Sequence, residues 1–177
     1  LKVQVCGPWT LAAALDRTRG DRVLADHGAR RDLAHSLAEG LAGHLAEVAR
    51  RVPGATVVAQ VDEPGLPAVL AAAIPTSSGF GRLRAVAPAE AESLLAVVLA
   101  AAGEWPVLHC CAAEPPAALS RRAGAVAVSL DASRLGDTVL DELAAAVEDG
   151  LMLWPGVVPV AAPVAPPSDR DLAERVE

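Results

Sequence analysis

Aromatic side chains are scarce in this sequence of 177 residues, which has three tryptophans, one phenylalanine and no tyrosine. This scarcity argues against modules that bind nucleic acid by stacking bases on aromatic rings. Positively charged residues are also few, because the chain has 15 Lys and Arg against 22 Asp and Glu, which gives a net charge of −7. A protein that binds the phosphate backbone needs a basic face, so we expect no nucleic-acid partner.

Cysteines and long hydrophobic runs are few as well. The three cysteines, of which Cys110 and Cys111 are neighbours, make no disulfide framework, so we expect a reducing, cytoplasmic location. No run approaches the ~18 consecutive apolar residues of a membrane span, and no signal peptide opens the chain. We therefore expect no membrane partner. Leu1 already lies inside an expected strand, which suggests a portion of a longer protein.

Strand patterns alternate with helix patterns along the whole chain, and we expect a single domain over 1–177. The expected strands are 1–6, 56–61, 106–110, 125–130 and 151–158. Such alternation favours parallel strands with right-handed crossovers, hence an α/β fold. A complete barrel takes about 250 residues, so we predict about five (βα) units of a TIM-type (β/α)8 barrel. A self-contained doubly wound sheet is the alternative.

The helices are expected between these strands, and several have clear ends. Asp26 is a plausible N-cap of a long helix that Pro53-Gly54 ends, and Pro88 opens another helix. Gly150 closes a helix over 137–148, and Ser168 caps the last one.

Ionisable and nucleophilic residues gather where the expected strands end, which is where α/β proteins place their sites. Asp62-Glu63-Pro64 follows the second strand, and Asp131 ends the fourth. His109 and Cys111 are two apart on an extended segment, so they point to the same side with Cα atoms ~6.6 Å apart. One zinc ion can bind both, with Asp131 as an oxygen ligand and a fourth position open, the pattern of catalytic zinc.

Each of these residues also has a purely structural interpretation. A His-x-Cys pair at a strand end is often only packed, and Cys6 is expected in the core. A carboxylate pair before Pro64 often only begins a helix, and Asp131 can cap a turn. Arg82 and Arg84 are expected in a solvated loop.

Four motifs in order resemble the catalytic barrel of cobalamin-independent methionine synthase. They are Gly7-Pro8-x-Thr10, Gln60-Val61-Asp62-Glu63-Pro64, His109-x-Cys111 and Leu130-Asp131-Ala132-Ser133-Arg134. The similarity is greatest to the short, single-barrel relatives of actinobacteria and spans nearly the whole chain. It implies a zinc-dependent methyltransferase of methionine biosynthesis, which transfers a methyl group from a folate or a corrinoid to a homocysteine-like thiol.

The resemblance also implies roles for single residues. His109 and Cys111 would bind zinc, with Asp131 in the place of the family's glutamate ligand, and Asp62 and Glu63 would bind the thiol substrate. The family's fourth ligand, a cysteine, would lie beyond Glu177. Ala161 stands where the family has its catalytic histidine, so we assign no catalytic residue. Because one ligand and several strands of the family's barrel would be missing from this chain, we expect it to be inactive alone.

Two other functions are open. One is a metal-free barrel enzyme of the same superfamily, decarboxylase-like, in which Arg82, Arg84 and Arg134 would bind substrate carboxylates. The other is a catalytically lapsed homologue that keeps the barrel.

Overall fold

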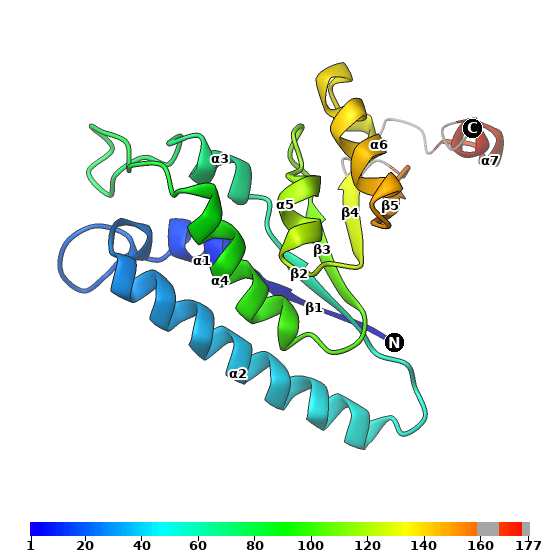
Figure 1. Cartoon of the computed structure of the whole chain (residues 1–177), viewed down its shortest axis with the longest axis horizontal. Helices are drawn as coiled ribbons and strands as arrows, with labels where there is room; N and C mark the ends of the chain where they lie inside the picture. The colour runs from blue at the N-terminus through cyan, green and yellow to red at the C-terminus, as the bar shows by residue number, and fades with distance from the viewer. Residues whose placement is uncertain (159–166, 175–177) are drawn as a thin grey trace.

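The computed structural model of the chain describes residues 1–158 and 167–174. In this part of the chain five parallel strands form one sheet in the order β1-β2-β3-β4-β5 (Figure 1). The strands are β1 (Lys2–Cys6), β2 (Val58–Asp62), β3 (Pro106–Cys110), β4 (Ala127–Asp131) and β5 (Met152–Gly156). All five predicted strands are confirmed, although the last one ends at Gly156, two residues earlier than predicted.

Helices connect the strands as predicted. The α-helices are α1 (Pro8–Ala14), α2 (His27–Arg51), α3 (Leu66–Leu70), α4 (Pro88–Ala100), α5 (Ala117–Arg122), α6 (Leu140–Glu148) and α7 (Asp169–Ala173). The described part of the chain also has three short 3-10 helices, η1 (Val23–Ala25), η2 (Ala132–Arg134) and η3 (Asp137–Val139). No helix in the described ranges is long and apolar enough to cross a membrane.

The strand order distinguishes the two predicted architectures. Each strand lies beside the one before it in sequence, so every crossover proceeds in the same direction. Right-handed crossovers in one direction place all connecting helices on one face of the sheet, whereas a doubly wound sheet reverses direction and covers both faces. Figure 1 shows the connecting helices α2, α4, α5 and α6 along one side of the sheet, with α2 packed on α4 and α5 on α6. The fold is therefore a partial TIM-type barrel, and the doubly wound alternative is wrong.

The hydrophobic core lies between the sheet and its helices. Val61, Leu108 and Val128 supply it from three neighbouring strands, and Leu95 supplies it from α4. Val107 is also fully buried but lies outside this core, because side chains alternate along β3 and turn it to the opposite face. We call that opposite face, which the helices do not cover, the inner face.

Local signals fix the helix ends as predicted. Asp26 accepts a hydrogen bond from the Ala29 N–H at 2.8 Å and so caps α2. Pro88 occupies the first turn of α4, where a missing N–H costs nothing. Gly150 follows α6 with a φ of +91°, a conformation that glycine adopts without strain. Ser168 forms a capping box at the start of α7.

Candidate functional site

Strand register brings five side chains to one level of the sheet, near the carboxyl ends of the strands. Cys6, Asp62, His109, Ser129 and Trp154 are consecutive Cα partners across β1 to β5. We call them the transverse row. They lie on the inner face, because the residues that flank them in their strands face the helices. The row therefore sets a thiol, a carboxylate, an imidazole and a hydroxyl side by side.

His109 and Cys111 have the alternation that the sequence predicts. Both are half-buried, whereas Cys110 between them is buried in the core, and burial raises the pKa of its thiol to about 11. His109 Nδ1 lies 3.2 Å from Ser129 Oγ, which leaves Nε2 as the ring nitrogen for a ligand. Cys111 is the first residue after β3, so it lies closer to the rim than His109.

Asp131 lies at the end of β4, beside this pair, but its carboxylate is engaged in its own turn. Its Oδ1 accepts hydrogen bonds from the Ser133 hydroxyl at 2.6 Å and from the Ser133 N–H at 3.0 Å. These bonds, with smaller contributions from Arg134 and His109, hold the pKa of Asp131 below its ordinary value. The turn-capping role that the sequence left open is thus the one that Asp131 fills here.

The predicted zinc ligands are of the types that zinc prefers, an imidazole, a thiol and a carboxylate. Their placement is less favourable. Within residues 1–158 and 167–174, no three His, Cys, Asp or Glu side chains lie close enough to hold a metal ion. With Asp131 bonded to Ser133, the three predicted ligands are not gathered around one point in the described part of the chain.

Asp62 has a defined orientation on the inner face. Its Oδ1 accepts a hydrogen bond from Gln60 Nε2 at 2.6 Å. Gln60 Oε1 in turn accepts one from Lys2 Nζ at 2.9 Å. Asp62 is half-buried, so a ligand above the sheet can approach its second oxygen.

Glu63 is separated from Asp62 although the two are neighbours in sequence. Alternation turns Glu63 to the helix side, where it is 0% exposed. Its Oε1 accepts from the Trp9 N–H at 2.8 Å, and its Oε2 accepts from the Thr10 N–H at 2.8 Å and the Thr10 hydroxyl at 2.6 Å. Burial raises the pKa of Glu63 to about 7, although these hydrogen bonds oppose the shift. With both oxygens enclosed, Glu63 is not accessible from the inner face on which Asp62 lies.

Two of the motifs that resemble the methionine synthase barrel meet at Glu63. A Cβ atom on Gly7 would lie 2.4 Å from Glu63 Oε1, so the carboxylate occupies the space that this glycine leaves. Thr10 Oγ1 also accepts a hydrogen bond from the Gly65 N–H at 3.1 Å. We call Gly7, Trp9, Thr10, Glu63 and Gly65 the Glu63 clamp. It ties the start of α1 to the end of β2.

Sequence reasoning placed Cys6 incorrectly. It was expected in the core but is exposed on the inner face, because Val3 and Val5 take the core side of β1. Burial of part of its surface, together with the charges of Glu63 and Asp62, raises the pKa of the Cys6 thiol. Period-two alternation along β1 was the signal that could have located it.

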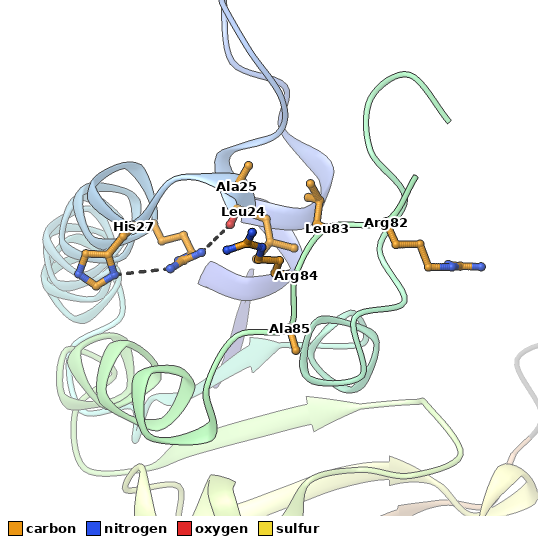
Figure 2. A pocket seen from close by; sticks show the side chains of 8 residues that line it. Leu24, Ala25, His27, Arg82, Leu83, Arg84 and Ala85 are labelled. Carbon is orange, nitrogen blue, oxygen red and sulfur yellow. Dashed lines mark hydrogen bonds between the residues drawn. The ribbon is translucent and has the colours of Figure 1, made fainter. Parts of the chain in front are cut away.

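The arginines of the metal-free alternative lie outside the strands that carry the transverse row, Arg82 and Arg84 in the loop before α4 and Arg134 in η2. A cavity of 480 Å³ is lined by Leu24, Ala25, His27, Arg30, Arg82, Leu83, Arg84 and Ala85, none of which belongs to a strand (Figure 2). Figure 2 shows Arg82 directed away from Leu24, and its guanidinium donates to the Ala73 carbonyl. Arg30 donates to the Leu24 carbonyl at 2.6 Å and pairs with Glu90. Arg134 is exposed in η2. The position of Ala161 lies outside the described residues.

A family model for the cobalamin-independent synthase catalytic domain matches residues 3–177. No curated protein matches the chain significantly. The family match covers nearly the whole sequence, and the parallel sheet with helices on one face agrees with it. The chain therefore belongs to the cobalamin-independent synthase catalytic-domain family.

Proposed function

We propose that the protein is a zinc-dependent methyltransferase of the cobalamin-independent methionine synthase type, which transfers a methyl group to a homocysteine-like thiol. The observation that supports this most directly is the transverse row, which sets Asp62 beside His109 on the inner face. Cys111 and Asp131 follow at the same end of the sheet. The proposed methyl donor is a folate or a corrinoid, and the proposed setting is the reducing cytoplasm.

Each site residue has a distinct role in this proposal. Asp62 binds the ammonium group of the amino acid thiol through Oδ2, because Oδ1 is already held by Gln60. His109 and Cys111 are the proposed zinc ligands, and Asp131 joins them if its carboxylate leaves Ser133. Zinc would supply one property, which is to keep a bound thiol in its nucleophilic thiolate form. Glu63 joins the start of α1 to the end of β2 beside Asp62 and makes no substrate contact.

The zinc assignment is tested by elemental analysis. The protein is loaded with zinc, dialysed and compared with the His109→Ala and Cys111→Ser variants. We expect the wild type to retain zinc and both variants to lose most of it. His44→Ala, on the exposed side of α2, is the matched control and should retain zinc as the wild type does. A wild type that retains no zinc would remove the metal from the proposal.

The activity of residues 1–177 alone is a separate prediction. The described strands form an open sheet in which β1 and β5 are edges, whereas a closed barrel surrounds its site with eight strands. We expect no methyl transfer from a folate or corrinoid donor to homocysteine by this chain. The measurement is a single-turnover assay of methionine formation, and product above the background without protein would contradict the expectation.

A further inference from the structure

Gln60 is a buried polar side chain in the middle of the inner face. It is 5% exposed and lies two residues before Asp62 in β2, so both side chains point to the same side of the sheet. Both ends of its amide are engaged, the Nε2 end by Asp62 and the Oε1 end by Lys2. A buried amide with both ends bonded is held in one orientation.

Lys2 sets that orientation. It is the only lysine of the chain, and its ammonium group has donors but no acceptor. If the Gln60 amide turned over, its NH2 group would face the ammonium and its oxygen would face the Asp62 carboxylate. Both contacts would then be repulsive. The cation on β1 therefore selects the amide orientation in which Nε2 faces Asp62.

The geometry points to Gln60 as a positioning residue that fixes the Asp62 carboxylate, with Lys2 as its support. Gln60 occupies Oδ1 and so presents Oδ2 to a ligand. It also stands between Lys2 and Asp62, so the lysine does not neutralise the carboxylate by a direct ion pair. A ligand with an ammonium group thus meets an oriented, negatively charged oxygen. The inference rests on the proposed function, in which that ligand is an amino acid thiol.

The test compares two thiols that differ only in the amino group, homocysteine and 4-mercaptobutyrate. Their dissociation constants are measured by calorimetry for the wild type, Gln60→Met and Gln4→Met. Methionine has the length of glutamine but makes no amide hydrogen bonds. Gln4 is the matched control, because it is the Cα partner of Gln60 on β1 and is exposed.

We expect Gln60→Met to weaken homocysteine binding about tenfold, which is the effect of about 1.4 kcal/mol, and to leave 4-mercaptobutyrate binding unchanged. Gln4→Met should change neither. General damage to the fold would weaken both thiols alike, and that result, like an unchanged homocysteine affinity, overturns the inference.

A second measurement separates the inference from the proposed function. The side-chain NH2 resonances of Gln60 are followed by NMR in the wild type and in Asp62→Asn. A shift of these resonances supports the hydrogen bond that carries the inference, and no shift overturns it. If the wild type binds neither thiol, the proposed function fails, and the resonances alone then decide the positioning role.

Discussion

Two opposing effects act on the pKa of a single residue, Glu63. Full burial disfavours its charged form, while three donors from Trp9 and Thr10 favour it. Gly7 belongs to the same arrangement, because only a residue without a Cβ leaves room for the carboxylate. The Glu63 clamp therefore depends on the absence of a Cβ at Gly7 and on the protonation state of Glu63.

Replacing Gly7 with alanine is expected to destabilise the protein. The added methyl group would meet Glu63 Oε1 at 2.4 Å, and the carboxylate could move aside only by breaking its hydrogen bonds to Trp9 and Thr10. We expect a loss of about 2–3 kcal/mol in the free energy of unfolding, measured by urea denaturation. Gly40→Ala is the control, because its Cβ in α2 meets nothing within 4 Å and should stabilise by about 0.5–1 kcal/mol. Equal effects of the two changes would contradict the steric argument.

The raised pKa of Glu63 predicts a dependence of stability on pH. Its ordinary pKa is 4.5 and its pKa in the folded protein is about 7, so between these values the folded state binds the proton more tightly. The free energy of unfolding should therefore fall as pH rises from about 5 to about 8, by at most roughly 3 kcal/mol. Asp26 and Asp131, whose pKa values are lowered, titrate below this range.

Glu63→Gln removes this titration. The urea midpoints of the wild type and the variant should be similar at pH 5, where the buried Glu63 is neutral like glutamine. They should differ at pH 8, where Glu63 of the wild type is ionised. Curves that run parallel across the range would show that Glu63 does not carry the effect.

Sequence patterns located the candidate residues better than they located their partners. The alternation that aligned His109 with Cys111 also turns Glu63 to the side of Val61, yet the Asp-Glu pair was interpreted as one unit. Asp131 was placed at the correct strand end, but its turn toward Ser133 depends on competition between local hydrogen bonds. Side-chain partners of this kind, like Lys2 with Gln60, connect positions far apart in sequence and leave no local signal.

Helices and strands are the scale at which the sequence was most informative, because caps, prolines and glycines act within a few residues. The N-cap Asp26 illustrates this and can be tested. Its carboxylate accepts from the Ala29 N–H and also pairs with Arg17. Asp26→Ala should lower the free energy of unfolding by about 1 kcal/mol in urea denaturation.

Asp32 provides the control for this helix. It is exposed in α2 and pairs only with its exposed neighbour Arg31 among the described ion pairs, so Asp32→Ala should change stability by less than about 0.5 kcal/mol. If both aspartates mattered equally, net charge rather than capping would explain the loss.

At the scale of the whole molecule, the strand order decides between a barrel segment and a doubly wound sheet, which the sequence left open. Both architectures have the same alternation of strands and helices, and they differ only in which strands are neighbours. That order depends on contacts between units, such as α2 with α4, rather than on any one segment. The positions of the transverse row then follow from the register of the strands.

The sequential strand order also has a consequence for biosynthesis. Each unit leaving the ribosome finds its hydrogen-bonding partner already made, since that partner is always the strand synthesised just before it. Assembly can then advance from the amino terminus without waiting for distant segments, and each new strand becomes one edge of the sheet while β1 remains the other edge.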